Sequence, residues 1–321
     1  MQRECILDYE YKERIMETIE LKGGVYPTMI TPYKDNKIDF DRVDALVEWY
    51  IKSGCAGIFA VCQSSEMAFL SLDERVSLAR AVVKAANGRI KIVASGHVAD
   101  SLEEQLRETE AIAATGVDSV VLVSNRFDLH NDGDDVWIKN AEKFLNYVDK
   151  NIQFGIYECP KPYKRLISLK LFKWILKSER FLFVKDTCCD PETIAERGDL
   201  LKNSKIKLFN ANGQTLLYSM IKGYAGYSGF IANYVPELLV WLCNNYDKDK
   251  DKAEIISEII SMMSFTVGPA YPSTAKYYIN KNIMPMEIFS RSCDEKKVDA
   301  YQRHVADQIH SLATRVKRII D

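Results

Sequence analysis

The sequence has no long apolar run, no excess of one charge and no cysteine pair with metal-binding spacing. No stretch approaches the roughly 18 apolar residues that a membrane-spanning helix needs, and the first residues are charged, unlike those of a signal peptide. The 43 basic and 45 acidic residues give a formal net charge of -2, which offers no electrostatic argument for nucleic acid or an anionic membrane. We therefore expect a cytoplasmic protein that binds neither nucleic acid nor a membrane.

The eight cysteines do not form a recognisable metal or redox motif. None belongs to a C-x-x-C pair, and no His/Cys cluster has zinc-ligand spacing. Cys188 and Cys189 are adjacent, which is more typical of small buried residues than of a redox pair. A glycine-rich phosphate loop is also missing, which argues against a phosphate-dependent metal enzyme. We expect reduced thiols, as the cytoplasm maintains, and neither a metal nor another cofactor.

Short apolar runs alternate with amphipathic helical stretches from residue 25 to about residue 245. The candidate strands are Val25–Ile30, Ala56–Val61, Ile90–Ala94, Ser119–Val123, Gln153–Tyr157, Phe181–Lys185, Lys207–Ala211 and Gly226–Phe230. The candidate helices are Phe40–Lys52, Leu72–Ala86, Leu102–Thr115, Val136–Val148, Leu169–Lys177, Pro191–Lys202, Thr215–Lys222 and Pro236–Tyr246. Nearly continuous hydrophobicity is typical of parallel strands covered on both faces. A series of eight such units predicts an α/β fold, the (β/α)8 TIM barrel.

The two ends of the chain do not continue this alternation. Residues 1–22 have the apolar spacing of one more amphipathic helix. After residue 246, a charged connector leads into three helical stretches and no strand pattern remains. We therefore predict an N-terminal extension over 1–22, a barrel over 23–246 and a C-terminal helical appendage over 247–321. Its helices are predicted at Ala253–Phe265, Ser273–Asn280 and Cys293–Ile320.

Lys185 is the residue most suggestive of chemistry. It closes the apolar run Phe181–Val184 and is followed by Asp186. Burial at the end of a core strand disfavours the ammonium form, which lowers the pKa and leaves an amine able to attack a carbonyl carbon. A lysine that extends from a strand end into solvent is the alternative.

Other polar residues follow the predicted strands, where a barrel of this kind carries its active site. A tyrosine, Tyr157, ends the strand next to that of Lys185. This pair suits carbonyl chemistry, in which the amine condenses with a 2-oxo acid and the phenol moves a proton. Hydroxyl and amide side chains suited to a substrate carboxylate follow other strands, namely Thr31, Gln63, Ser64, Ser65 and Ser228.

Four short motifs occur in order along the chain. They are G-x-x-P-T-x-x-T-P-Y from Gly24 to Tyr33, a polar loop that ends in Glu66 and leads to Leu70-Ser71-x-Asp-Glu-Arg75, Tyr157-x-x-Pro160, and Val184-Lys185-Asp186. Together they resemble the dihydrodipicolinate synthase / N-acetylneuraminate lyase family. The resemblance extends over about residues 24–236, with a compatible helical tail beyond.

The resemblance implies a class I aldolase-like barrel that assembles as a homo-oligomer, a dimer or a tetramer. It implies that Lys185 forms a Schiff base with pyruvate or a related 2-oxo acid and that Tyr157 relays protons. Ser64 matches the hydroxyl residue that binds the substrate carboxylate in the family's G-[TS]-T-G-E loop.

Three departures from the family pattern concern the substrate site. The G-[TS]-T-G-E loop reads Cys62-Gln63-Ser64-Ser65-Glu66, with Ser65 in place of a glycine that has more conformational freedom. The family's P-Y-Y reads Ser124-Asn125-Arg126, so a tyrosine lent across a subunit interface is missing. An arginine that grips the second substrate is replaced by Pro162. Arg126 suits bidentate binding of a substrate carboxylate or a weak surface or inter-subunit ion pair.

These observations favour a Schiff-base-forming lyase or aldolase with an altered second-substrate site. A non-catalytic or regulatory binding barrel from the same family is the alternative, because the loop at residues 62–66 is rebuilt. The presence of both Lys185 and Tyr157 argues for the enzyme, since a site without chemistry has no physical reason to bury a lysine.

Overall fold

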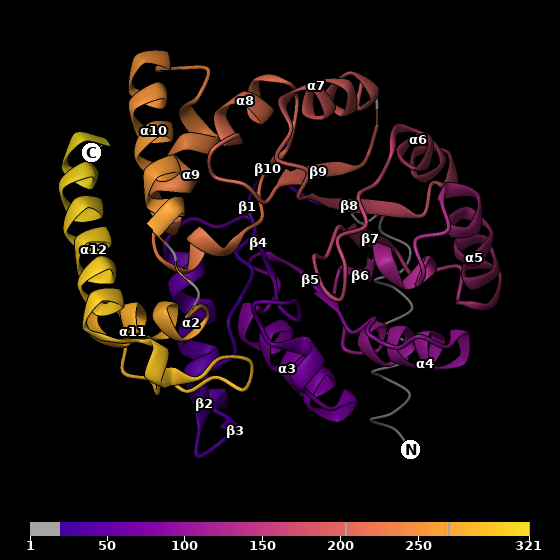
Figure 1. Ribbon diagram of the computed structural model, residues 1–321, viewed down its shortest axis with the longest axis horizontal. Helices are drawn as coiled ribbons and strands as arrows, with labels where there is room; N and C mark the ends of the chain where they lie inside the picture. The colour runs from indigo at the N-terminus through magenta and orange to yellow at the C-terminus, as the bar shows by residue number, and fades with distance from the viewer. Residues whose placement is uncertain (1–19, 203, 267, 269, 321) are drawn as a thin grey trace.

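A single sheet of eight parallel strands forms the centre of the molecule (Figure 1). The computed structural model describes residues 20–320 except 203, 267 and 269. The strands are β1 (Gly24–Val25), β4 (Gly57–Phe59), β5 (Lys91–Ser95), β6 (Ser119–Val123), β7 (Phe154–Tyr157), β8 (Phe181–Asp186), β9 (Lys207–Asn210) and β10 (Gly226–Tyr227), in the order β1-β10-β9-β8-β7-β6-β5-β4. A parallel bridge between Thr28 and Phe59 joins the two edges. The predicted TIM barrel is confirmed.

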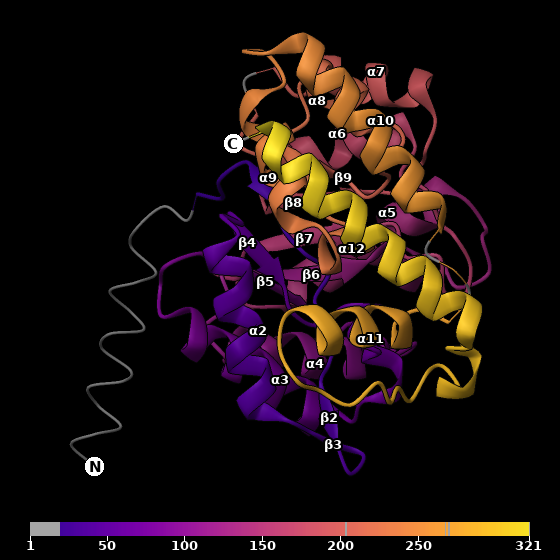
Figure 2. The same cartoon turned by 90° about the vertical axis from the view of Figure 1, so that its left-hand side faces the viewer.

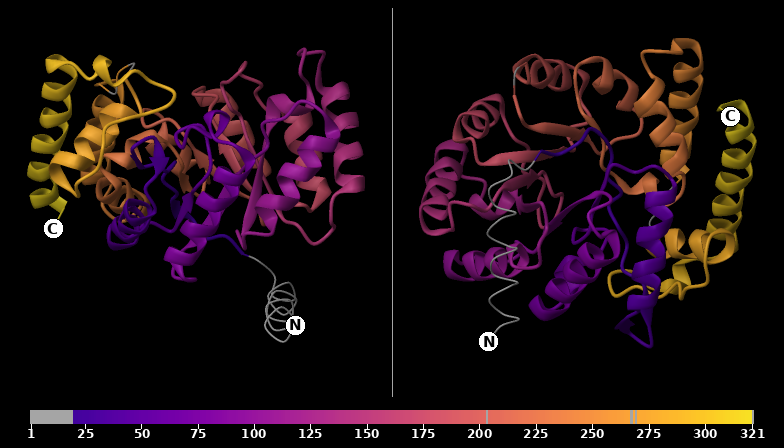
Figure 3. Two further views of the ribbon diagram at one scale, coloured as in Figure 1. Left: turned by 90° about the horizontal axis from the view of Figure 1, so that it is seen from below. Right: turned by 180° about the vertical axis from the view of Figure 1, so that it is seen from behind.

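Helices surround the barrel and alternate with its strands, as Figure 3 shows from below and from behind. They are α2 (Phe40–Lys52), α3 (Leu72–Ala86), α4 (Leu102–Ala113), α5 (Asp134–Tyr147), α6 (Leu169–Ser178), α7 (Pro191–Leu200), α8 (Leu216–Ile221) and α9 (Pro236–Asn245). Side chains that cap the first backbone N–H groups determine where these helices start. Ser71 and Glu74 form a capping box at α3, and Asp190 caps α7 immediately before Pro191.

Three helices follow the barrel next to α9, and Figure 2 shows α12 running alongside α10. They are α10 (Lys250–Thr266), α11 (Ser273–Asn282) and α12 (Ala300–Ile320). Two predicted starts were wrong. The helix predicted from Ala253 starts at Lys250, within the charged connector, because Asp249 accepts the N–H of Lys252. The last helix starts at Ala300 instead of Cys293, because Asp299 caps it through the N–H of Gln302.

Two further parts of the chain differ from the sequence prediction or fall outside the structure. A short antiparallel hairpin, β2 (Tyr33–Lys34) with β3 (Lys37–Ile38), was not predicted. Its turn residues Asp35 and Asn36 have φ of 50° and 60°, a conformation that these two residue types tolerate. The predicted N-terminal helix lies outside the described residues, apart from 20–22, which are not helical.

An aromatic layer fills the interior of the barrel. The rings of Phe183 and Phe209 stack with centroids 4.9 Å apart, Tyr26 lies 4.7 Å from Phe209, and Phe59 lies 5.7 Å from Phe183. The Tyr157 ring lies 5.8 Å from that of Phe59 and so borders this layer. The packed layer leaves the carboxyl ends of the strands, and the loops that follow them, as the place for a substrate.

Candidate active site

Lys185 and Tyr157 lie side by side on adjacent strands. They are register partners in the pairing of β7 with β8. The Lys185 Nζ is 4.1 Å from the centre of the Tyr157 ring and 5.7 Å from that of Phe59. The lysine side chain is buried, with 6% of the residue exposed. The structure therefore brings the two predicted catalytic residues together, with the amine enclosed by aromatic faces.

Burial sets the protonation of both groups. Desolvation lowers the pKa of Lys185 to about 8, and the nearby thiols of Cys62 and Cys159 oppose this shift only partly. Desolvation raises the pKa of the Tyr157 phenol well above its usual value of 10.0. Since one pH unit below a pKa leaves about a tenth of the group deprotonated, a useful fraction of the amine is neutral near pH 7. The phenol stays protonated and able to donate.

Gln63 links the loop after β4 to Tyr157. Its Oε1 accepts a hydrogen bond from the Tyr157 hydroxyl at 3.3 Å and another from the Cys159 thiol at 3.4 Å. The glutamine thus fixes the direction of the phenol, whose proton points at the amide oxygen instead of at the barrel core.

Ser64 belongs to a small cluster of hydroxyl groups. Its Oγ donates to Thr28 Oγ1 at 3.0 Å. Burial raises the pKa of the Tyr271 phenol, in the segment before α11, well above its usual value, and these two side chains oppose the shift. Asn233 Nδ2 donates to the same phenol at 3.1 Å. Sequence reasoning missed Tyr271, because a contact across about 200 residues leaves no local pattern.

The hydroxyls of Ser65 and Thr31 bind backbone carbonyls. Ser65 Oγ lies 2.6 Å from the Ala60 carbonyl oxygen and also accepts the Cys62 N–H at 2.9 Å. Thr31 Oγ1 donates to the Ser65 carbonyl at 2.7 Å. These bonds favour a role in holding the loop, and a substrate contact by either hydroxyl stays a prediction. Ser228 is different, because its buried Oγ has no hydrogen-bond partner in the described part of the chain.

Arg126 and Asn125 lie in the short 3-10 helix Ser124–Phe127 after β6. The Arg126 guanidinium forms an ion pair with the exposed carboxylate of Asp100, a type of pair that contributes little to stability. Asn125 Nδ2 donates to three carbonyls of the loop after β7, those of Cys159, Lys161 and Tyr163. Asn125 therefore holds the loop that contains Pro162, a role that sequence reasoning did not assign.

The C-terminal region also holds the loop at residues 62–66, which we call the candidate substrate loop. Glu66 has φ of 63°, a left-handed conformation that is rare for a glutamate. Its Oε1 is 3.1 Å from Lys276 Nζ of α11, with both side chains fully buried, and its Oε2 accepts the N–H of Ser292 at 2.7 Å. Burial lowers the pKa of Lys276 to about 8, opposed by Glu66. This buried pair fixes the end of the candidate substrate loop.

Comparison with known proteins identifies the family. Residues 21–291 match the Dihydrodipicolinate synthetase family. The chain belongs to this family. The 4-hydroxy-tetrahydrodipicolinate synthase of Methanocaldococcus jannaschii is 24% identical over 259 residues, 80% of this chain and 87% of that protein. The corresponding synthase of Hydrogenobaculum is 26% identical over 258 residues, 78% of this chain and 87% of its own length.

Solved structures of family members share the fold. A dihydrodipicolinate synthase has a TM-score of 0.78 at 22% identity, covering 91% of this chain and 99% of its own. A catalytic-lysine mutant of the sialic acid aldolase of Ruminococcus gnavus has a TM-score of 0.82 at 17% identity, covering 95% and 100%. The family resemblance read from the motifs is thereby confirmed, and it places the chain in a family of lyases.

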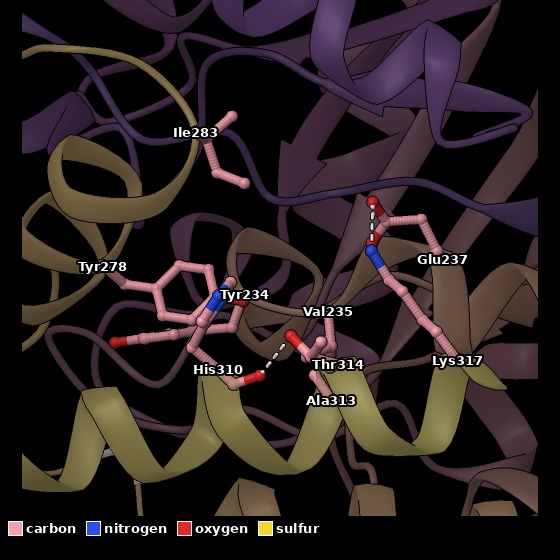
Figure 4. A pocket seen from close by; sticks show the side chains of 9 residues that line it. All are labelled: Tyr234, Val235, Glu237, Tyr278, Ile283, His310, Ala313, Thr314 and Lys317. Atoms are coloured by element: carbon pink, nitrogen blue, oxygen red, sulfur yellow. Dashed lines mark hydrogen bonds and ion pairs between the residues drawn. The ribbon is translucent and has the colours of Figure 1, made fainter.

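A pocket between α9, α11 and α12 is lined by Tyr234, Val235, Glu237, Tyr278, Ile283, His310, Ala313, Thr314 and Lys317 (Figure 4). It contains none of the predicted site residues. Across the described residues, no group of three or more His, Cys, Asp or Glu side chains is arranged to hold a metal ion. No helix in that part is long and apolar enough to span a membrane.

Proposed function

We propose that this chain is a Schiff-base-forming lyase or aldolase acting on pyruvate or a related 2-oxo acid. The observation that carries the proposal is the buried Lys185 amine, with a pKa of about 8, at 4.1 Å from the Tyr157 ring. The neutral amine attacks the carbonyl carbon, and loss of water leaves a protonated imine. The imine withdraws electrons, so that C3 can lose a proton to give the enamine or break its bond to an aldehyde-derived carbon.

The proposed proton carrier is Tyr157. Its phenol donates to the carbonyl oxygen as water leaves, and the phenolate takes a proton back from the next intermediate, so no net proton is consumed by the residue. Gln63 holds the phenol toward the candidate substrate loop. General acid–base help of this kind contributes about 10²–10⁴ in rate.

The proposed carboxylate site consists of hydroxyl groups. Ser64 has its hydroxyl in the cluster with Thr28 and Tyr271. Ser228 supports the proposal through its buried, unpartnered Oγ, because an unsatisfied hydroxyl in a dry site is costly unless a ligand completes it. Ser65 and Thr31 shape the loop that presents Ser64.

The proposed second-substrate site differs from that of a dihydrodipicolinate synthase. Pro162 cannot form the charge-assisted fork of an arginine. The Arg126 guanidinium already forms an ion pair with Asp100. Its other N–H groups would bind a substrate carboxylate at a different place from an arginine at the position of Pro162. The carbonyl partner is therefore proposed to be an aldehyde other than aspartate semialdehyde, such as one derived from a sugar acid.

A homo-oligomer, dimer or tetramer, and a cytoplasmic location complete the proposal. A non-catalytic barrel is the other candidate, and the buried amine argues against it. Burial of a lysine next to two aromatic rings costs stability, and a binding barrel gains nothing from it.

Reductive trapping tests the proposed function. Pyruvate with borohydride should add one reduced pyruvyl group per chain, and Lys185→Ala should abolish the addition. A panel of short 2-oxo acids should be included, because the donor is assigned by family alone. No adduct with any of them would rule out the enzyme and favour the binding barrel.

A further inference from the structure

Two carboxylates directly follow the proposed catalytic pair in the sequence. Glu158 follows Tyr157, and Asp186 follows Lys185. Because successive side chains of a strand alternate between its two faces, these carboxylates lie on the side of the strands opposite the amine and the phenol. Glu158 is fully buried and Asp186 is 1% exposed. Two anions in such a place need compensation.

A single arginine from α7 binds both carboxylates. Arg197 Nη2 is 2.6 Å from Glu158 Oε1, and Arg197 Nη1 is 2.7 Å from Asp186 Oδ2. The arginine side chain is itself only 1% exposed. We refer to these three residues as the Arg197 clamp. One guanidinium thus connects the positions that immediately follow the two catalytic residues.

The rest of the clamp is hydrogen-bonded to the loops after the strands. Glu158 accepts the N–H of Ile167 at 2.7 Å and that of Thr187 at 2.6 Å. Asp186 accepts the N–H of Cys188 at 2.6 Å and the hydroxyl of Tyr224 at 2.5 Å. In addition to its ion pair with the arginine, Glu158 therefore holds the loops after β7 and β8. Asp186 holds the loop after β8 in the same way.

The clamp lies where the backbone pairing of β7 with β8 stops. Tyr157 and Lys185 are the last register partners of the two strands. The bond beyond them, from the Glu158 N–H to the Lys185 carbonyl, is long at 3.3 Å. Beyond this bond, the two strand ends are joined by the clamp and by Thr187, whose Oγ1 donates to the Glu158 carbonyl at 2.9 Å, just where the amine must face the phenol. Removal of one partner of such a buried ion pair leaves the other as an uncompensated charge.

We propose that Arg197 is a positioning residue that holds Tyr157 against Lys185 through Glu158 and Asp186. The inference rests on the proposed Schiff-base function and adds a residue outside the substrate site. Given time, the amine alone forms the imine that borohydride traps, even where the phenol no longer speeds the loss of water, whereas proton transfer at C3 requires the amine and the phenol in register. Displacement of a reacting group by about 1 Å costs on the order of 10²-fold in rate. Loss of the clamp should therefore impair proton transfer far more than trapping.

Two measurements with pyruvate alone separate these steps. Borohydride trapping counts the chains whose Lys185 forms the imine. Exchange of the pyruvate methyl protons in D2O, followed by NMR, reports the enamine step, in which C3 loses a proton and regains a deuteron. The exchange rate per trappable chain is the readout, and it is independent of the fraction of unfolded protein.

Arg197→Met is the test variant, and Arg75→Met is its matched control. Arg75 forms a comparable buried pair with Glu108 at 2.7 Å, and Glu108 likewise accepts backbone N–H groups of a loop after a strand, those of Val98 and Ala99. Both variants remove a buried guanidinium, so both should lower the melting temperature. We expect exchange per trappable chain to fall about 10- to 100-fold in Arg197→Met and to stay within about twofold in Arg75→Met.

Conservative variants keep the test decisive if Arg197→Met does not fold. Arg197→Lys keeps the positive charge but can contact only one carboxylate at a time. Glu158→Gln removes the ion pair on the Tyr157 side. We expect the exchange rate to fall less in Arg197→Lys than in Glu158→Gln. Exchange per trappable chain within about twofold of the unaltered protein in these variants, or an equal loss in Arg75→Met, would overturn the positioning role alone. Absence of trapping in the unaltered protein would instead overturn the proposed function, and the positioning role with it.

Discussion

The Lys185 Nζ lies 4.1 Å from the centre of the Tyr157 ring, on the neighbouring strand. At that distance an ammonium would gain from the aromatic face, yet burial outweighs this and lowers the pKa of the amine to about 8. The same enclosure raises the pKa of the phenol. The two strands thus present an amine that is partly neutral beside a phenol that stays protonated.

Tyr157→Phe should remove the proton carrier and leave the nucleophile. We expect a loss of about 10²–10⁴ in pyruvate methyl exchange, with trapping at Lys185 retained. Tm should change little, because the phenol makes only a long bond of 3.3 Å to Gln63. Unchanged exchange in the Phe variant would mean that the tyrosine merely packs against the lysine.

The rate of imine formation should depend on pH through Lys185. The protonated amine cannot attack, so the rate of trapping should rise with pH, reach half its maximum near pH 8 and level off above it. Trapping reactions between pH 6 and 10, each stopped at a series of times, measure this rate. A half-point near the roughly 10.4 of a free lysine would show that the amine is solvated in the working protein.

Lys276→Met should destabilise the protein strongly, because Glu66 would be left as a buried unpaired charge. Removal of one partner of such a pair costs about 3–5 kcal/mol, to be measured by denaturant unfolding. The double variant Glu66→Gln/Lys276→Met is the control and should recover part of this loss. A cost below about 1 kcal/mol for the single variant would mean that the C-terminal helices do not hold the candidate substrate loop.

The protein should be a poor dihydrodipicolinate synthase. Loss of a charge-assisted arginine contact, at the position of Pro162, costs on the order of 1.5–3 kcal/mol, or about ten- to a hundredfold in affinity. A coupled assay with pyruvate and aspartate semialdehyde measures the efficiency. A value within about tenfold of a working synthase would contradict this expectation. Arg126→Ala would then show whether that arginine has taken over the carboxylate.

The parts of the fold that depend on local patterns were predictable from the sequence. The barrel follows from strand and helix periodicity, and the neighbouring places of Lys185 and Tyr157 follow from the order of the strands in a parallel barrel. The hairpin after β1 was missed because its strands have two residues each, too few for a period. The helix start at Ala300 depended on which aspartate served as the cap.

The parts of the site that depend on long-range contacts were not predictable. Tyr271, in the C-terminal region, has its pKa lowered by the Ser64 side chain against the larger effect of burial, and Lys276 neutralises Glu66 from a helix about 210 residues away. Arg197 belongs to an amphipathic helix in which an arginine is expected to be exposed. The hydroxyls of Ser65 and Thr31 bind backbone carbonyls, contacts that no local pattern of the sequence indicates, and their predicted contact with substrate stays a prediction.

Peptide mapping of the trapped adduct tests the central claim most directly. Among the described residues, two buried lysines have a pKa of about 8, Lys185 and Lys276, and they differ in that Lys276 is paired with a carboxylate. After treatment with pyruvate and borohydride, mass spectrometry of the digested protein should find the reduced pyruvyl group on Lys185 and leave Lys276 unmodified. A label on Lys276, labels spread over surface lysines, or no label at all would contradict the assignment of Lys185 as the Schiff-base residue.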